Sequence, residues 1–134
     1  MPRSIFVNLA VKDVKKTIDF FGSLGFEFNE QFTGESAACM IVNEHAFVML
    51  LGHDHFKSFT TRPIADSSKS TEVLVALSAD SREAVDALVK KALAGGGSEA
   101  NKPQDHGFMY GWSFQDLDNH IWEVVWMDPN HLQK

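Results

Sequence analysis

The chain has 134 residues and a formal net charge of −6, with 12 lysines and arginines against 18 aspartates and glutamates. This length suits one domain. A content of 44% hydrophobic and 22% charged residues is typical of a soluble globular protein with an apolar core. The acidic balance disfavours nucleic-acid binding, which depends on lysine and arginine contacts to phosphates.

The single cysteine, Cys39, excludes an internal disulfide and a cysteine-rich zinc site. It lies in the apolar run 37–42, so we expect a buried small hydrophobe and not a nucleophile. No stretch approaches the roughly 18 consecutive apolar residues of a membrane span. The first residues, MPRSIFVNLAV, are too short and too strand-like for a signal peptide. We therefore expect a cytoplasmic protein that does not contact a membrane.

The first half of the chain predicts one helix and four strands. Apolar residues recur at helical spacing from Val14 until Gly25 ends the run, and Asp13 is the expected N-cap. The strands are rich in β-branched and apolar residues. They are expected at residues 4–11, 26–29, 37–42 and 46–51.

The same order of elements returns after residues 53–70, a polar segment expected to form a long connection or a short irregular helix. A strand at 71–77 precedes a helix that starts at Asp80, with Glu83 three residues later as in a capping box. The run Gly95-Gly96-Gly97 ends this helix. The strands expected after it are residues 98–102, 109–114 and 120–126.

A β-α-β-β-β unit therefore occurs twice, which predicts an α+β fold. We align residues 6–11 with 72–77, and residues 45–51 with 120–126. The expected organisation is one domain with two modules, a connection and a tail. Their residues are 1–52 and 71–127 for the modules, 53–70 for the connection and 128–134 for the tail.

Two phrases resemble a known family. Residues 20–26, FFGSLGF, follow the first helix, and residues 114–123, FQDLDNHIWE, lead into the last strand. With the repeated module, they resemble the vicinal-oxygen-chelate superfamily, which includes glyoxalase I, extradiol dioxygenases, fosfomycin-resistance enzymes and bleomycin-resistance proteins. The second phrase is similar to the family motif Asp-Pro-Asp-Gly-His-x-x-Glu, with Leu117 replacing proline and Asn119 replacing glycine. Asparagine tolerates a positive φ, so we expect the turn to be kept.

The resemblance implies that each module curls its sheet into a half-barrel and that the two sheets surround a cup-shaped cavity with a divalent metal. The usual four ligands come from the first and fourth strands of each module. In our alignment these positions are Phe6, Val48, Glu72 and Glu123. Only Glu72 and Glu123 are able to bind a metal. Two carboxylates favour Mg²⁺ or Mn²⁺, completed by substrate and water oxygens, although the identity of the metal stays open.

Both carboxylates also have simpler interpretations. Glu123 is flanked by apolar residues, so it is a metal ligand or general base, or else a glutamate hydrogen-bonded in a solvated cup. Glu72 stands at the start of a strand, where an exposed charge needs no function. If both face one cavity without a metal, we expect them to share a proton.

Four candidate substrate-binding residues come from strands and loops. Phe6 and Val48 stand at the apolar ligand positions, and Asn8 offers a carbonyl oxygen further along the first strand. His106 lies in a loop expected at the lip of the cup.

The stretch 109–114 adds aromatic candidates. Tyr110, Trp112 and Phe114 alternate and therefore share one face of a strand. Such a stripe is either core or an aromatic wall of a binding cavity, and we include Tyr110 and Trp112 as substrate-binding candidates. Whether this stripe or the alternate residues face the cup stays open.

The resemblance implies two competing functions. One is a glyoxalase-like enzyme, similar to lactoylglutathione lyases or dioxygenases, in which a metal and Glu123 polarise vicinal substrate oxygens and move a proton. The other is a metal-free protein of the bleomycin-resistance type that binds a small molecule without chemistry. The apolar residues Phe6 and Val48 at two of the implied ligand positions favour this second function. Relatives of this size commonly pair, so a homodimer is expected from the resemblance.

Overall fold

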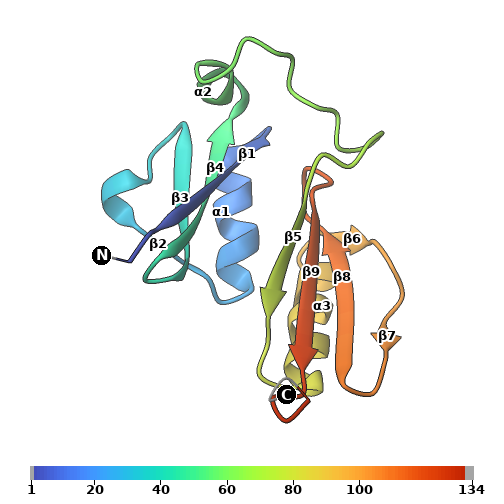
Figure 1. The fold of residues 1–134 in the computed structure, drawn as a ribbon. Coiled ribbons are helices and arrows are strands. Elements are labelled where there is room, and N and C mark those ends of the chain that lie inside the picture. The colour runs from blue at the N-terminus through green and yellow to red at the C-terminus, as the bar shows by residue number, and fades with distance from the viewer. Residues whose placement is uncertain (1, 132–134) are drawn as a thin grey trace. The chain divides into compact units, whose positions relative to one another are not determined.

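The computed structural model describes residues 2–131, which form two compact α+β units (Figure 1). The first unit is Met1–Asp66 and the second is Ser67–Lys134, so the boundary falls within the segment predicted as a connection. Part of the predicted tail, residues 132–134, lies outside the described residues. Each unit holds one β-α-β-β-β module, which confirms the predicted fold class.

The first unit carries a four-stranded mixed sheet in the order β1-β4-β3-β2. Strands β1 and β4 are parallel, and the other pairs are antiparallel. As predicted, Asp13 caps the first helix, because its carboxylate accepts a hydrogen bond from Lys16 N at 3.0 Å. The elements are β1 (Ile5–Val11), α1 (Val14–Ser23), β2 (Glu27–Phe28), the 3-10 turn η1 (Glu30–Phe32), β3 (Ala37–Asn43), β4 (Ala46–Gly52) and α2 (His53–Lys57).

The second unit repeats this topology, with the order β5-β9-β8-β6 and β7 added against β8. Strands β5 and β9 are parallel, like β1 and β4, whereas β8 pairs antiparallel with its neighbours. The repeated order confirms the internal repeat. The elements are β5 (Leu74–Ser78), α3 (Arg82–Ala94), β6 (Ser98–Glu99), β7 (Gln104–Asp105), β8 (Met109–Gln115) and β9 (Ile121–Met127).

Several boundaries differ from the prediction, and two of the differences concern residues named above. The N-cap of α3 is Ser81 and not Asp80, because the Ser81 hydroxyl accepts the hydrogen bond from Ala84 N at 3.0 Å. Strand β5 begins at Leu74 and not at residue 71, since its pairing with β9 starts at Leu74 and Ile121. Glu72 therefore precedes the strand on which it was predicted.

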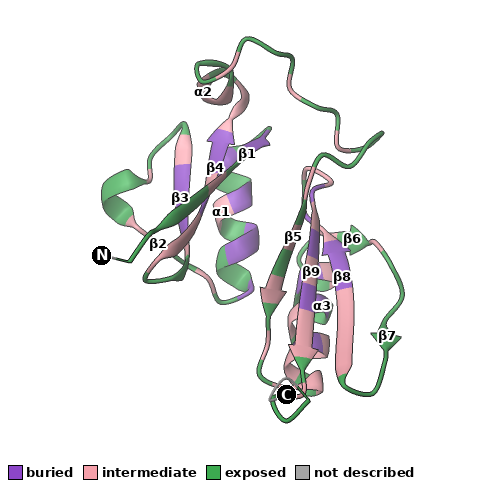
Figure 2. Ribbon diagram, in the orientation of Figure 1, coloured by how far each residue is buried: buried purple, intermediate pink, exposed green. Residues whose placement is uncertain are grey.

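Each sheet packs one face against a helix of its own unit (Figure 2). In the first unit α1 contacts β3 and β4, and in the second α3 contacts β6, β8 and β9. We call the other side of each sheet its open face. The buried strand residues on the helix-facing sides are Leu9, Val11, Ala38, Met40, Val48 and Leu50 in the first unit, and Phe114, Trp122 and Val124 in the second.

The aromatic stripe of β8 belongs to the helix-facing side. Tyr110, Trp112 and Phe114 pair with Trp126, Val124 and Trp122 of β9. The Tyr110 hydroxyl donates to Asp86 of α3 at 2.6 Å. The stripe is therefore part of the core between α3 and its sheet.

This contact predicts an unusual titration of Tyr110, the only tyrosine in the sequence. The hydrogen bond to Asp86, with burial adding to it, raises the pKa of Tyr110 to about 12. Because the folded state holds this proton more tightly, the stability it contributes is complete below pH 10 and is lost as the pH rises towards 12.

We expect phenolate absorbance to appear near pH 12 in the wild type and at a clearly lower pH in Asp86→Asn, which removes the charged acceptor. Circular dichroism at each pH shows whether the chain is still folded. Equal titration midpoints in the two folded proteins would contradict the assigned contact.

Candidate functional site

The open face of the second sheet contains a cavity of about 100 Å³. Polar side chains from the β6–β7 connection and β8 lie beside apolar ones, with Glu123 contributed by β9. This size fits a small molecule or one end of a larger one. The lining residues are Asn101, Lys102, Gln104, Met109, Gly111, Trp112, Ser113, Glu123 and Val125.

Glu123 is the charged strand residue on this open face. It pairs with Ala76 and Ser113, whereas its neighbours Trp122 and Val124 point to the helix side and are fully buried. Among the described residues the side chain of Glu123 has no hydrogen-bond or ion-pair partner. A half-buried carboxylate without a protein partner is free to meet a ligand.

Lys102 supplies the opposite charge in the same cavity. It lies between β6 and β7, and it also has no hydrogen-bond or ion-pair partner within residues 2–131. The cavity therefore offers a proton acceptor and a cation that no protein group neutralises. Sequence analysis missed Lys102 because nothing distinguishes a single lysine in a polar loop from a solvated one.

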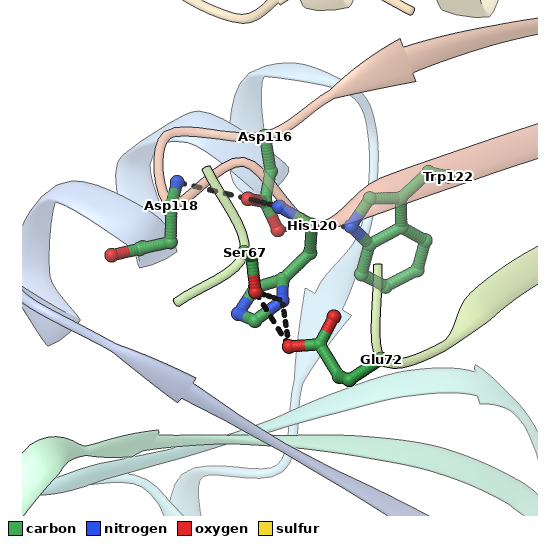
Figure 3. A network of polar contacts seen from close by, with 6 residues as sticks. All are labelled: Ser67, Glu72, Asp116, Asp118, His120 and Trp122. Atoms are coloured by element: carbon green, nitrogen blue, oxygen red, sulfur yellow. Dashed lines mark hydrogen bonds and ion pairs between the residues drawn. The ribbon is translucent and has the colours of Figure 1, made fainter. Parts of the chain in front are cut away.

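Asp116 holds together the turn before β9, the strand that carries Glu123 (Figure 3). One oxygen of Asp116 accepts from the backbone N–H groups of Asp118 and His120 at 2.9 and 3.0 Å. Its other oxygen accepts from Trp122 Nε1 at 2.9 Å. Asn119 has φ of 66°, which confirms the prediction that asparagine takes the left-handed position here.

Asp116 is almost completely buried, with 3% of its surface exposed. Burial raises the pKa of its carboxyl group, although His120 and the hydrogen bond from Trp122 act in the opposite direction. The carboxyl stands on the helix-facing side with Trp122, and not in the cavity. Its role is to position the β8–β9 turn.

The structure does not bring Glu72 and Glu123 together. The Glu72 carboxylate accepts a hydrogen bond from the Ser67 hydroxyl at 2.5 Å and lies 3.5 Å from His120 Nδ1 (Figure 3). Ser67 also lies 3.3 Å from His120 Nδ1. Because serine and glutamate approach the same ring nitrogen, this is not the arrangement of a nucleophilic triad, in which they occupy opposite nitrogens. The cluster ties the segment before β5 to the β8–β9 turn.

The two modules can be aligned from the structure itself. Phe6 and Leu74 each stand seven residues before a helix N-cap, Asp13 and Ser81 respectively. The partners of Phe6 and Leu74 across the parallel ladders are Phe47 and Ile121.

Two residues further along the fourth strands stand Met49 and Glu123. The residue equivalent to Glu123 is therefore Met49 and not Val48, and the residue equivalent to Phe6 is Leu74 and not Glu72. Both corrections follow from register, since a shift of one residue moves a side chain to the other face of a sheet.

The corrected positions do not fit a divalent metal. Three of the four implied ligand positions carry Phe6, Met49 and Leu74, and only Glu123 offers a carboxylate oxygen. A phenyl ring and an isobutyl group have no donor atom, and a thioether suits soft metals, not Mg²⁺ or Mn²⁺. Within residues 2–131, no three histidine, cysteine, aspartate or glutamate side chains gather as a metal site would require.

Phe6, Asn8, Val48 and His106 are not among the residues that line the Glu123 cavity. Phe6 and Asn8 are exposed on the open face of the first sheet, whereas Val48 faces α1 and is 2% exposed. His106 is exposed in the β7–β8 turn and does not line the cavity. The ring of Trp112 belongs to the helix-facing stripe of β8, although the residue borders the cavity.

A larger hollow of about 740 Å³ lies in the first unit, beside the starts of α1 and α2. Its charged residues have both signs, and the Asp13 carboxylate is already used to cap α1. Its lining includes none of the four implied ligand positions. We therefore place the candidate site at Glu123, where an unpaired carboxylate and an unpaired lysine share a smaller cavity.

Solved structures with a similar fold span almost the whole chain. A hypothetical protein from S. aureus shares 28% identity at a TM-score of 0.78, with 93% of this chain and 94% of that one covered. A glyoxalase/bleomycin resistance protein/dioxygenase family enzyme from Burkholderia phytofirmans has a TM-score of 0.77 at 17% sequence identity, with 91% of this chain and 96% of that one covered. The fosfomycin resistance protein FosX from Listeria monocytogenes has a TM-score of 0.64 at 20% sequence identity, with 93% of this chain and 90% of that one covered.

No curated protein matches the chain. Among residues 2–131, no helix is long and apolar enough to cross a membrane. The model of the Glyoxalase/Bleomycin resistance protein/Dioxygenase superfamily matches residues 4–124. Because this match spans most of the chain and the paired modules have the corresponding topology, the chain belongs to this superfamily.

Proposed function

We propose that the protein is a glyoxalase-like enzyme that moves a proton on a small substrate with vicinal oxygens, with Glu123 as the general base. The observation that carries the proposal is the unpaired Glu123 carboxylate in one cavity with the unpaired cation of Lys102. Glu123 takes the proton from a carbon beside a carbonyl group, the electron pair of the broken C–H bond forms a carbon–carbon double bond, and the π pair of the carbonyl group moves to its oxygen. The proton then returns to the same or the neighbouring carbon.

Lys102 complements this step electrostatically. The carbonyl oxygen becomes negatively charged when the C–H bond breaks, and a fixed cation stabilises that charge more than the neutral ground state. Asn101 and Gln104 add amide groups able to hydrogen-bond a second oxygen. No step needs a divalent metal, in keeping with the donor set.

The direct test uses hydroxyacetone, which carries a carbonyl and a hydroxyl oxygen on adjacent carbons. In deuterated buffer with EDTA, we expect the protein to accelerate the exchange of the hydroxymethyl C–H for deuterium, followed by proton NMR. The hemithioacetal of methylglyoxal and glutathione is assayed in parallel. If neither compound reacts faster than in buffer, the proposed proton transfer is wrong for these substrate types.

Replacing Lys102 with methionine tests the cation. We expect the exchange rate to fall about tenfold, because the developing oxyanion loses its countercharge. Lys90→Met is the matched control, since Lys90 is exposed on α3. Equal rates in the two variants would remove Lys102 from the mechanism.

A second candidate function is binding without chemistry, as in a bleomycin resistance protein. It is favoured by the apolar residues Phe6, Met49 and Leu74 at the implied ligand positions. A compound that binds tightly and shows no exchange would favour this function. The homodimer and the cytoplasmic location expected from the sequence stay predictions.

A further inference from the structure

We propose that Arg82 is a positioning residue for the Glu123 cavity, acting through residues 101–105, which we call the wall segment. Lys102 and Gln104 of this segment line the cavity, whereas Arg82 does not. The inference rests on the proposed function, since it concerns how the same cavity keeps its shape. It adds a residue of α3 to the residues on which the proton transfer depends.

The wall segment has few contacts of its own. It follows β6, and every one of its residues is exposed. Near its start, Asn101 N donates to the Ser113 hydroxyl at 3.0 Å. At its end, β7 consists of Gln104 and Asp105 alone and pairs with no strand but β8 among residues 2–131. A short exposed strand opens easily, so the placement of the wall depends on what else holds β7.

Arg82 supplies that additional contact. Its Nη1 lies 2.5 Å from Asp105 Oδ2, and its Nη2 donates to the Gly107 carbonyl oxygen at 2.9 Å. The other carboxylate oxygen of Asp105 accepts from Gly107 N at 2.9 Å. Because a planar guanidinium bonds two acceptors at once, Arg82 joins β7 and the turn after it to the start of α3.

Two aromatic rings hold the guanidinium in place. Arg82 Cζ lies 5.4 Å from the centroid of the Tyr110 ring and 5.1 Å from that of the Trp126 ring, on β8 and β9. Arg82 is also the first residue of α3, where a cation is unfavourable because the helix N-terminus is already positive. The helix is therefore not stabilised by this charge, and its favourable contacts are with β7, the following turn and the sheet.

Loss of Arg82 is expected to affect one side of the cavity only. Without the guanidinium, β7 is held by its pairing with β8, and the wall segment opens more often. The Lys102 ammonium is then less often beside the developing oxyanion. Glu123 is not affected in this way, because β9 pairs with β5 on one side and with β8 on the other.

The first measurement is amide hydrogen exchange followed by NMR. Asn101 and His106, on either side of Lys102 and β7, both have hydrogen-bonded amides. We expect these amides to exchange about fivefold faster in Arg82→Met, the upper range for loss of an exposed ion pair. Asp105→Asn, which removes the charge on the β7 side, is expected to act in the same direction.

The second measurement is the rate of substrate deuterium exchange with hydroxyacetone, at a temperature where circular dichroism shows every variant folded. We expect Arg82→Met to lower this rate roughly threefold to fivefold in the wild type and to have almost no further effect in Lys102→Met. A merely structural role would leave the rate of the folded protein unchanged. Arg82→Lys is expected to restore part of the rate, because an ammonium is a point charge without the planar fork.

Arg62→Met is the matched control, since Arg62 is exposed and belongs to the first unit, and it is expected to change neither measurement. The proposal is overturned if Arg82→Met leaves the amide exchange or the substrate rate unchanged. It is also overturned if Arg82→Met slows Lys102→Met by the same factor as the wild type. Absence of substrate exchange in the wild type instead contradicts the proposed function, and amide exchange then decides alone whether Arg82 holds the wall segment.

Discussion

Glu123→Gln is expected to lower the rate of deuterium exchange by a factor of about 10² to 10⁴, the usual contribution of a positioned general base. Glutamine has the same shape but does not accept the substrate proton. The Glu123 carboxylate has no hydrogen-bond partner among the described residues, so the substitution breaks no contact of the fold. We therefore expect an unchanged thermal midpoint together with the loss of exchange.

The measurement compares initial exchange rates of hydroxyacetone in deuterated buffer. Glu99→Gln is the matched control, since Glu99 pairs with Phe114 and so belongs to the helix-facing side of the same sheet. Residual activity equal to that of the wild type would remove Glu123 from the mechanism. A parallel fall in stability would instead assign it a structural role.

Asp116→Ala is expected to cost about 3 kcal/mol of the free energy of unfolding. Asp116 accepts hydrogen bonds from the backbone of Asp118 and His120 and from the Trp122 indole, and alanine accepts none of them. A buried donor left without an acceptor costs roughly 1–3 kcal/mol. His120 and Trp122 are buried, so water does not easily replace the lost acceptor.

Urea denaturation followed by tryptophan fluorescence measures this loss. The stability of the isosteric variant Asp116→Asn is expected to lie between those of Asp116→Ala and the wild type. Its amide NH₂ group faces a donor at one of the three contacts, and its oxygen still accepts at the others. A loss below 1 kcal/mol in Asp116→Ala would show that water satisfies these donors.

The contribution of Asp116 to stability depends on pH in a direction that follows from its pKa. Burial raises the pKa of its carboxyl group above the ordinary value of 3.8, so the folded state binds the proton more tightly than the unfolded chain does. The stability contributed by this proton is complete below pH 3.8 and is lost as the pH rises through the folded pKa. The stability advantage of the wild type over Asp116→Asn is therefore expected to shrink over that window.

The element order of both modules could be predicted from local signals. Helical spacing after Val14, the Asp13 cap and the Gly95-Gly96-Gly97 stop are properties of the backbone and of nearest neighbours. The two-residue strand β7 was missed, because its Gln104 and Asp105 have little intrinsic tendency to form strands. Its pairing with β8 is what holds it.

The register of the strands was harder to predict from the sequence than the order of the elements. Strand β4, AFVMLLG, is apolar at almost every position, so alternation does not reveal which residues face α1. The sequence alignment therefore paired Val48 with Glu123, and ladder pairing shows that Met49 is the equivalent residue. The helix-facing side of the Tyr110 stripe was undecided for a similar reason, and the bond to Asp86 settles it.

The sequence by itself determined the superfamily resemblance, the repeated α+β module, the positive φ of Asn119 and the place of Glu123 among the apolar residues of the last strand. These depend on local pattern and on the side chains themselves. Only the tertiary structure decided that Lys102 shares the cavity of Glu123, that Glu72 contacts Ser67 and His120, and that Phe6 stacks on Phe47. Such contacts join residues from different elements, and strand pairing and loop placement determine their distances.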